Sequence, residues 1–417
     1  MVVETLSTGE ELQLGAVTDT NAGVIAMALT EQLGLTVSRH SRIGDDAAGL
    51  TGLLTEIAGR AHVCIVTGGL GPTSDDVTAC AAADAAQVPL KHSDNALASI
   101  RRYFEKRGRC QTQRDTKQAK LPEGAVCLHN DIGTAPGFRL DIASCRFFFL
   151  PGVPREMTWM LETHVIGAIA SLLGPDHPVT ERRQLTVFGL PEAGVNERLR
   201  DLRDAVPGIQ VGYRAVFPEI QVKLVFQDIR ADRAREKADA AAVFAARQLG
   251  PHLVSDTGAS LPEALGKTLT LGGKTLAVAE SCTGGLIGHL LTGVAGSSDY
   301  FLLSAVTYAN SAKQRVLGVS TETLDAWGAV SEAVIREMAE GVKALSGADY
   351  GLATSGIAGP GGGSPEKPVG TVWIGVAGPD PTLAEMFQID FRNRRMNKRV
   401  FAYTALDRLR RMLDSSV

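Results

Sequence analysis

Ser281 is the residue of this chain whose setting best suits nucleophilic chemistry. It follows an apolar segment, Thr275 to Ala279, that is expected to be a strand, and Gly284-Gly285 after it begin a helical pattern. At such a strand–turn–helix junction a side chain points into a crevice, and backbone N–H groups at the helix start can stabilise an oxyanion. We therefore predict a serine nucleophile, although a serine that only caps the helix has the same pattern.

A serine hydroxyl needs a base, and the histidines are poorly placed to act as one. His289 lies inside the predicted helix and His252 precedes this part of the chain. Lys313 is a better candidate, because partial burial lowers the pKa of a lysine toward neutrality. Tyr308 is close enough in sequence to join it, and together with Ser281 the two residues would suit acyl transfer. The alternative is an ordinary surface lysine.

Other residues near Ser281 suit substrate binding. The glycine-rich segment Gly356 to Gly363 can wrap a phosphate or a ribose, and the hydroxyls of Thr283 and Ser298 are expected near the same crevice. Apolar segments flank the glycines, which argues against a flexible linker. Cys282 is an alternative nucleophile, but no histidine activates it, and a buried structural thiol is the commoner role.

A second candidate site follows an apolar segment that ends at Thr67. Its glycines, which allow a phosphate to approach the backbone, are Gly68, Gly69 and Gly71. Thr73 and Ser74 can cap the next helix, whose N-terminus favours anions. Asp75 and Asp76 would repel a phosphate unless a divalent cation lies between them, so we predict metal-assisted phosphate chemistry. The alternative is that both aspartates only cap the helix.

Composition limits the classes of function. The chain has 417 residues, 44% of them hydrophobic and 21% charged, which fits two or three globular domains. The net charge of -4 argues against a general nucleic-acid binder and favours small ligands. Six cysteines form no CxxC pair, no secretory signal is evident, and no segment has the roughly 20 apolar residues of a membrane span. We expect a cytoplasmic protein with reduced thiols.

Alternation of strands and helices predicts an α/β fold in three parts. Residues 1–172 have a βαβ rhythm, which predicts a parallel sheet covered on both faces, with ligands beyond the carboxyl ends of its strands. Residues 178–255 are expected to form a small α+β middle domain, and residues 260–414 a second α/β domain. Exposed sheet edges make a homodimer the expected assembly.

The N-terminal motifs resemble the molybdopterin-binding-like domain of the competence/damage-inducible CinA family. The segments that carry this resemblance are Gly9-Glu10, Asp19-Thr20-Asn21, 67–76, Lys117-Gln118-Ala119, 133–138 and 150–154. The resemblance implies a parallel or mixed sheet and a pyrophosphatase, dependent on Mg²⁺ or a similar metal, that cleaves ADP-ribose to AMP and ribose 5-phosphate. The substrate-binding residues that it implies are Gly68, Gly69, Gly71, Thr73, Lys117 and Gln118. The implied metal ligands are Asp75, Asp76, Glu10 and Asp19.

The C-terminal motifs resemble the CinA C-terminal domain. They comprise residues 279–285, 296–298, 307–313, 328–332, 355–360 and 367–372. This resemblance implies a nicotinamide-nucleotide amidase that converts NMN and water to nicotinate mononucleotide and ammonia without a cofactor. It makes Ser281 the nucleophile, with Tyr308 and Lys313 its activating partners. The implied substrate-binding residues are Thr283, Gly284, Gly285, Ser298, Gly356 and Gly359. Arg394 is assigned to the 5′-phosphate, and the adjacent Arg395 leaves that register open.

Two other functions remain open at this stage. The first domain could instead bind or adenylylate molybdopterin, since the fold is shared with molybdenum-cofactor enzymes. The chain could also be a non-catalytic partner in DNA uptake or repair, as the family name suggests. Our prediction is a bifunctional hydrolase of NAD metabolism whose partners are NMN and ADP-ribose, with no nucleic acid and no membrane.

Overall fold

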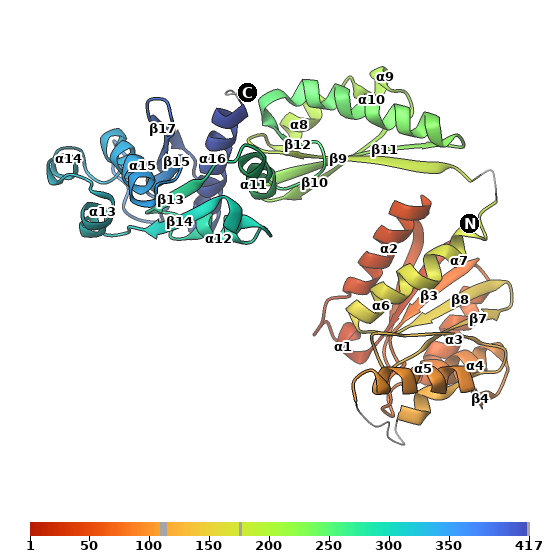
Figure 1. Cartoon of the computed structure of the whole chain (residues 1–417). Coiled ribbons are helices and arrows are strands. Elements are labelled where there is room, and N and C mark those ends of the chain that lie inside the picture. Colours follow the sequence, from red (N-terminus) through yellow and green to blue (C-terminus); the bar gives the residue numbers. More distant parts are fainter. Residues whose placement is uncertain (109–114, 175–176, 415–417) are drawn as a thin grey trace. The chain divides into compact units, whose positions relative to one another are not determined.

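The structure, a computed structural model, describes residues 1–108, 115–174 and 177–414 (Figure 1). Contacts divide the chain into two compact units. Unit 1 comprises Met1–Glu181 and Gln227–Ala234, and unit 2 comprises the rest of the described chain. The predicted middle segment therefore packs mainly with the C-terminal part.

Unit 1 is built on a six-stranded mixed sheet in the order β2-β1-β3-β8-β7-β6. The strands are β1 (Val3–Thr8), β2 (Val37–Ile43), β3 (Val63–Thr67), β6 (Val126–Leu128), β7 (Gly137–Ile142) and β8 (Cys145–Leu150). The first four strands in this order are parallel to one another. Strand β7 pairs antiparallel with β8, and β6 pairs antiparallel with β7. The predicted α/β fold with a parallel or mixed sheet is thus confirmed. In addition, β4 (Leu90–His92) and β5 (Lys120–Pro122) form a separate two-stranded antiparallel sheet.

Helices cover both faces of this sheet (Figure 1). One face packs on α3 (Ala47–Ala58), α4 (Thr78–Ala86) and α5 (Asp94–Glu105), and the other on α2 (Thr20–Leu33), α6 (Pro154–Met160) and α7 (Ile166–Ala170). Successive residues of one strand enter opposite cores: Cys64 and Val66 join the first, and Val63 and Ile65 the second. This two-residue period explains why a central strand is apolar throughout.

Unit 2 begins with a four-stranded sheet in the order β10-β11-β9-β12. Its strands are β9 (Val179–Val187), β10 (Gln210–Val216), β11 (Glu219–Asp228) and β12 (Leu253–Ser255), and its helices are α8 (Glu192–Arg198), α9 (Leu202–Ala205) and α10 (Ala231–Leu249). The buried face of α10 consists of alanines at helical spacing with a leucine at the end: Ala234, Ala238, Ala241, Ala245 and Leu249. The middle domain expected over residues 178–255 corresponds to these elements.

The C-terminal part of unit 2 has a five-stranded sheet in the order β14-β13-β15-β16-β17. The strands are β13 (Leu276–Glu280), β14 (Phe301–Val306), β15 (Tyr350–Gly356), β16 (Thr371–Ala377) and β17 (Leu383–Gln388). The first three strands in this order are parallel to one another. Strand β16 pairs antiparallel with β15, and β17 pairs antiparallel with β16. One face packs on α11 (Leu261–Leu271), α12 (Leu286–Thr292) and α16 (Arg394–Asp414), and the other on α14 (Thr321–Trp327) and α15 (Glu332–Ser346), with the end of α13 (Asn310–Leu317).

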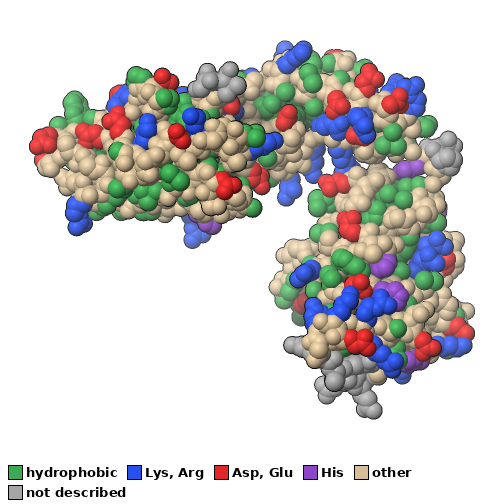
Figure 2. All heavy atoms as spheres, in the orientation of Figure 1, with side chains coloured by type: hydrophobic (Ala, Val, Ile, Leu, Met, Phe, Trp, Pro, Cys, Tyr) green, Lys and Arg blue, Asp and Glu red, His purple; other side chains and the backbone are tan. Residues whose placement is uncertain are grey.

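Surface and thiol properties agree with the composition. Acidic and basic side chains are interspersed on the face shown in Figure 2. No helix in the described residues is long and apolar enough to cross a membrane. The five cysteines within the described ranges are free thiols, as expected, and Cys110 lies outside those ranges.

Candidate active sites

Ser281 lies at the carboxyl end of β13, in a tight turn that leads into α12. Its N–H donates to the carbonyl of Thr354 in the neighbouring β15 at 3.0 Å, and the N–H of Gly284 donates back to the Ser281 carbonyl at 3.2 Å. Gly285 has a φ of 87°, which places the residue before the helix in the left-handed region that glycine adopts easily. The predicted strand–turn–helix setting is the one observed.

A buried carboxylate, which the sequence analysis missed, holds this turn in place. Glu280 is fully buried and accepts hydrogen bonds from the N–H groups of Ile287 at 3.0 Å and Gly288 at 2.9 Å. The hydroxyl of Ser304 donates to it at 3.3 Å. Glu280 therefore satisfies the free N–H groups at the start of α12 from beneath. An acidic residue at the end of an apolar strand, just before a helix, was the available signal.

Lys313 meets Ser281 in space. Its Nζ lies 3.1 Å from the Ser281 Oγ, and it is also bonded to the carbonyls of Thr307 at 2.9 Å and Tyr308 at 3.2 Å. The side chain is only 1% exposed, and this burial lowers the pKa of its amine. An amine that loses its proton more easily and touches a serine hydroxyl can serve as a base.

The phenol of Tyr308 lies elsewhere. It is exposed, and its oxygen accepts a hydrogen bond from Arg394 Nη2 at 3.3 Å. Arg394 is anchored in turn by a 2.6 Å bond from Nη1 to the Gly359 carbonyl. Tyr308 thus reaches Lys313 through its backbone carbonyl, while its ring and Arg394 lie side by side at the site.

A cavity of about 280 Å³ opens beside Ser281 and Lys313. Its lining includes Gly356 and Gly359 of the glycine-rich segment and also Arg394, but not Arg395. Arg395 lines a separate depression with Lys398, so the geometry places Arg394, and not its neighbour, at the serine. Asn310 and Ser355 also line the cavity; the sequence analysis quoted their motifs without assigning them a role.

Four predicted binding residues lie outside this cavity. Thr283 is fully buried, with its hydroxyl 2.8 Å from that of Thr354. Gly284 and Gly285 line the depression that contains Arg395. Ser298 is exposed in the turn Ser297–Asp299 just before β14. Since β14 runs parallel to β13, the residues that precede it lie at the opposite edge of the sheet from Ser281.

Cys282 is an unsuitable nucleophile in this setting. It is buried within the hydrophobic core, and desolvation raises the pKa of its thiol to about 12. The reactive species of a cysteine is the thiolate, which burial disfavours. The geometry supports the serine.

The second candidate site is a cavity of about 560 Å³ beyond the carboxyl ends of β1, β3 and β8. Of the predicted residues, those that line it are Gly68, Gly69, Gly71, Asp75, Asp76, Gln118 and Asp19. At Gly68 (φ 104°) an added Cβ would lie 2.4 Å from the Thr8 carbonyl oxygen, so only glycine fits this turn. The cavity lies at the strand ends, where ligands of such sheets bind.

Most polar groups of this loop hold the loop itself. Asp76 accepts two hydrogen bonds from Thr73, one of 2.9 Å from its backbone N–H and one from its side-chain hydroxyl. Lys117 donates to the carbonyls of Thr73 and Asp76, the latter at 3.1 Å. Hydrogen bonding from Thr73 lowers the pKa of Asp75, which therefore stays ionised. Thr73 and Lys117 support the cavity without lining it.

Gln118 offers a free group to a ligand. Its Nε2 donates to the Leu70 carbonyl at 3.0 Å, whereas its buried Oε1 has no partner within the described part of the chain. Asn21 behaves alike, with Nδ2 bonded to the Gly152 carbonyl at 2.8 Å and Oδ1 unpaired. Buried polar atoms without partners are rare in native structures, so these oxygens suit hydrogen-bond donors of a bound molecule.

The predicted metal ligands do not form a ready-made cluster. In the described ranges no three His, Cys, Asp or Glu side chains are placed to hold a metal, and Glu10 lies outside the cavity lining. Asp19 caps α2 through a 3.0 Å bond from the Ala22 N–H. Mg²⁺ nevertheless often binds through one or two carboxylates together with substrate phosphates. Asp75 and Asp76 fit a metal of that kind, carried by the substrate.

Glu156, a residue to which the sequence analysis gave no role, also lines this cavity. Asn130 donates to its Oε2 at 2.7 Å, and burial raises the pKa of its carboxyl. Because Asn130 is itself 1% exposed, the carboxyl is held in a fixed position. A half-buried acid in a cavity suits proton transfer.

Family comparisons match both parts of the chain. The family model described as CinA C-terminal domain matches residues 258–413, and that described as probable molybdopterin binding domain matches residues 4–171. A CinA-like protein of Desulfosudis oleivorans is 51% identical over 413 residues, covering 99% of this chain and 100% of that protein. The chain belongs to the CinA-like family. A second CinA-like protein, of Desulforapulum autotrophicum, is 45% identical over 417 residues, covering 99% of this chain and 98% of that protein.

Solved structures with the CinA name match a smaller part of the chain. The competence/damage inducible protein CihA from Agrobacterium tumefaciens is 39% identical, with 37% of this chain and 97% of that chain covered and a TM-score of 0.35. The predicted resemblance to the CinA family is confirmed by the full-length relatives.

Proposed function

We propose that unit 2 hydrolyses the amide of NMN to give nicotinate mononucleotide and ammonia. The observation that supports this most directly is the 3.1 Å contact between the Ser281 Oγ and the Nζ of the buried Lys313. The contact lies at the wall of a cavity that also holds a guanidinium, Arg394. The choice of a nicotinamide nucleotide comes from the CinA motifs, and hydrolysis of an amide from the serine–lysine pair.

The three contacts of Lys313 suit a neutral amine. Such an amine has two N–H groups, which can bond to the carbonyls of Thr307 and Tyr308, and one lone pair, which then faces the Ser281 hydroxyl. As the Ser281 Oγ attacks the amide carbonyl, Lys313 takes the hydroxyl proton. The resulting ammonium can donate to all three oxygens, which stabilises it at the moment it forms.

Release of the products completes the cycle. Lys313 gives its proton to the amide nitrogen, and the C–N bond breaks. Ammonia departs, and the acyl group remains on Ser281 as an ester. Lys313 then takes a proton from water, whose oxygen attacks the ester, and the acid product leaves as Ser281 regains its hydrogen. Backbone N–H groups of the turn after Ser281 are the expected oxyanion donors, and Arg394 the partner of the 5′-phosphate. These steps require no metal or cofactor.

Ammonia release from NMN by the purified full-length chain tests this function. We expect Ser281→Ala and Lys313→Ala each to lower turnover by roughly a thousandfold or more, since residues that act as one unit fail together. Ser298→Ala is the matched control and should keep full activity, because Ser298 lies at the other edge of the sheet. Unchanged turnover in both site variants, as a non-catalytic partner in DNA uptake or repair would show, contradicts the proposal.

A second activity, metal-dependent cleavage of ADP-ribose to AMP and ribose 5-phosphate, is proposed for unit 1. It is favoured by the 560 Å³ cavity in which the glycine turn adjoins Asp75 and Asp76. A bound divalent ion would neutralise the pyrophosphate and activate water, and these two carboxylates would hold it. The unpaired oxygen of Gln118 would accept a hydrogen bond from the substrate.

Metal titration with ADP-ribose tests unit 1. Asp75→Ala and Asp76→Ala should abolish cleavage of ADP-ribose and leave ammonia release from NMN unchanged. A chelator added to the wild type should also abolish cleavage of ADP-ribose and leave ammonia release unchanged. If both variants keep full cleavage, the proposed metal site is wrong. Tight molybdopterin binding without ADP-ribose turnover would favour the alternative function of this fold. A homodimer and a cytoplasmic location remain part of the proposal.

A further inference from the structure

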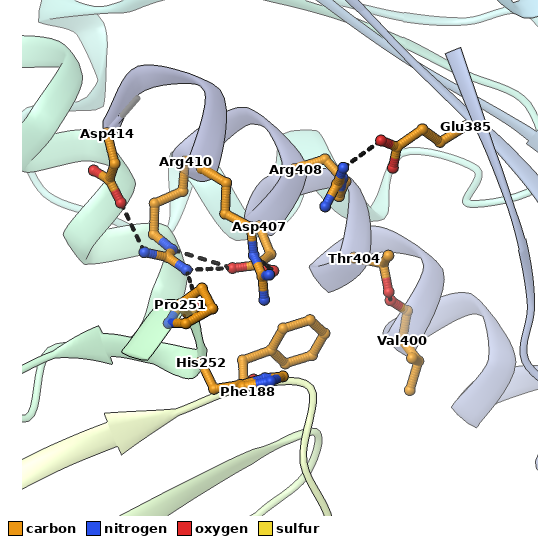
Figure 3. Close-up of polar contacts among 11 residues, drawn as sticks. Phe188, Pro251, His252, Glu385, Val400, Thr404, Asp407, Arg408, Arg410 and Asp414 are labelled. Carbon is orange, nitrogen blue, oxygen red and sulfur yellow. Dashed lines mark hydrogen bonds and ion pairs between the residues drawn. The ribbon is translucent and has the colours of Figure 1, made fainter. Parts of the chain in front are cut away.

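Unit 2 contains a second cavity, of about 600 Å³, that shares no lining residue with the Ser281 cavity. It lies between the β9–β12 sheet and the segment from β17 to α16. Phe188 and Ile220 line it from the sheet, and Phe387, Ile389 and Val400 from the other side. Figure 3 shows Phe188 and His252 facing the α16 residues Val400, Thr404 and Asp407 across this space.

The walls are those of a small-molecule site. Phe217 and Phe391, from the two sides, meet edge to face with centroids 5.4 Å apart and planes at 87°. With Phe188 and Phe387, four aromatic rings line one cavity, which is open to solvent. Pockets of several hundred Å³ with apolar walls and a few polar groups are typical of sites for organic ligands, and aromatic walls favour a planar ring.

Charged groups gather at the α16 side. Asp407 is ion-paired with Arg410 and with Arg411, each at 2.7 Å. Arg410 also pairs with Asp414 at 2.8 Å, and Figure 3 shows both pairs of Arg410. Arg408 pairs with Glu385, yet its buried Nε has no acceptor within the described residues. The Arg408 guanidinium also lies 5.9 Å from the centre of the Phe387 ring. This wall therefore has an unsatisfied donor next to an aromatic surface.

The remaining titratable groups of the lining are Glu192, Glu219 and His252. Glu219 accepts the Leu261 N–H at 2.7 Å, and the Nδ1 of His252 lies 3.2 Å from the Phe188 carbonyl. Glu192 is exposed at the start of α8. The unpaired donor of the described lining is the Nε of Arg408, so an acidic group of a ligand would be stabilised on the Arg408 side.

The second cavity adjoins the Ser281 site through one short segment. The N–H of Phe391, a wall residue, donates to Asn397 Oδ1 at 2.7 Å. Asn397 is fully buried and donates through Nδ2 to the carbonyl of Ala358, which lines the Ser281 cavity, at 3.2 Å. Three residues after Phe391, Arg394 enters that same cavity. A ligand that contacts Phe391 can therefore act on the position of Arg394.

We propose that this cavity binds a small planar aromatic acid, with its ring among the phenylalanines and its acidic group toward Arg408, and that occupancy tunes the Ser281 site. The regulatory half rests on the proposed amidase function. Contact of the ligand with Phe391 would hold Arg394 in the position that binds the substrate phosphate, so occupancy lowers KM for NMN.

Fluorescence titration of the full chain with 8-anilinonaphthalene-1-sulfonate, an aromatic acid, tests the site without reference to catalysis. Ala215, a small lining residue, provides the blocking variant Ala215→Trp, which should weaken binding at least about tenfold. Leu271→Trp adds the same ring at an exposed position of α11 and should change nothing. Equal binding by the wild type and Ala215→Trp would overturn the site.

The uncharged N-phenyl-1-naphthylamine tests the acidic group. Arg408→Met should weaken the sulfonate about tenfold and leave the neutral compound unaffected. Equal losses for both compounds, or none for either, would overturn the assignment of an acid.

Kinetics with NMN test the regulatory half. Saturating sulfonate should lower KM by on the order of fivefold in the wild type and not in Ala215→Trp. An unchanged KM overturns regulation. Complete absence of amidase activity overturns it too, together with the proposed function, while the fluorescence results still decide the binding site.

Discussion

Lys313 is the residue whose chemistry depends most on its surroundings. Burial lowers the pKa of its amine, and the neutral form is the one that can accept the Ser281 proton. We expect kcat/KM for NMN to fall as pH drops below this lowered pKa and to level off below the ordinary lysine value of about 10.4. A pH–rate profile that still rises at that ordinary value would contradict a buried lysine base.

Tyr308→Phe separates two roles for the tyrosine. Its carbonyl contacts Lys313 and its phenol contacts Arg394, so removal of the hydroxyl should raise KM by about threefold and leave the pH profile unchanged. A shifted profile would instead show that the phenol relays the proton, as the motif resemblance implies. Steady-state kinetics across pH distinguish the two outcomes.

Glu219 provides a pH effect on stability. Desolvation raises the pKa of its carboxyl from 4.5 to about 7, so the folded chain holds this proton more tightly than the unfolded chain. Its stabilising contribution is complete below about pH 4.5 and is lost as pH rises through about 7. Glu219→Gln cannot ionise, so between about pH 4.5 and pH 8 its stability relative to the wild type should rise by roughly 3 kcal/mol. A constant difference in the free energy of unfolding would contradict this.

At the scale of elements, the junction of β13 and α12 depends on Glu280. Its carboxylate accepts two N–H groups of the helix start, which would be left buried and unpaired in Glu280→Ala. We expect a loss of roughly 3 kcal/mol in unfolding free energy and a loss of amidase activity, with Glu280→Gln intermediate. Glu332→Ala, at an exposed ion pair on α15, should change stability by less than about 0.5 kcal/mol. Similar melting temperatures for Glu280→Ala and Glu332→Ala would refute this role.

At the scale of the whole molecule, the two candidate sites belong to separate compact units, each with its own hydrophobic cores. We therefore expect Ser281→Ala to abolish ammonia release and leave ADP-ribose cleavage unchanged, and Asp76→Ala to do the reverse. The KM for ADP-ribose should be unchanged in Ser281→Ala, and the KM for NMN should be unchanged in Asp76→Ala. Parallel assays of the two variants check this, and joint loss of both activities would mean that the sites are coupled.

Sequence patterns alone predict the α/β class, the family and the local setting of Ser281. These depend on short-range patterns: an apolar strand, a glycine turn and a helix start require no knowledge of distant contacts. The two cavities at strand ends follow from the same patterns, because parallel strands bring their following loops to one edge. The glycine loop at residues 68–71 was found in this way.

Which side chains meet depends on how distant segments pack. Ser281 and Lys313 are 32 residues apart, and their contact depends on β13 and β14 lying side by side. Ser298 was expected near Ser281, but the direction of β14 places it at the opposite edge. Asn397 and the phenylalanine-lined cavity of unit 2 had no sequence signal, since burial of a polar side chain and a cavity lined by four rings arise only when separate segments pack together.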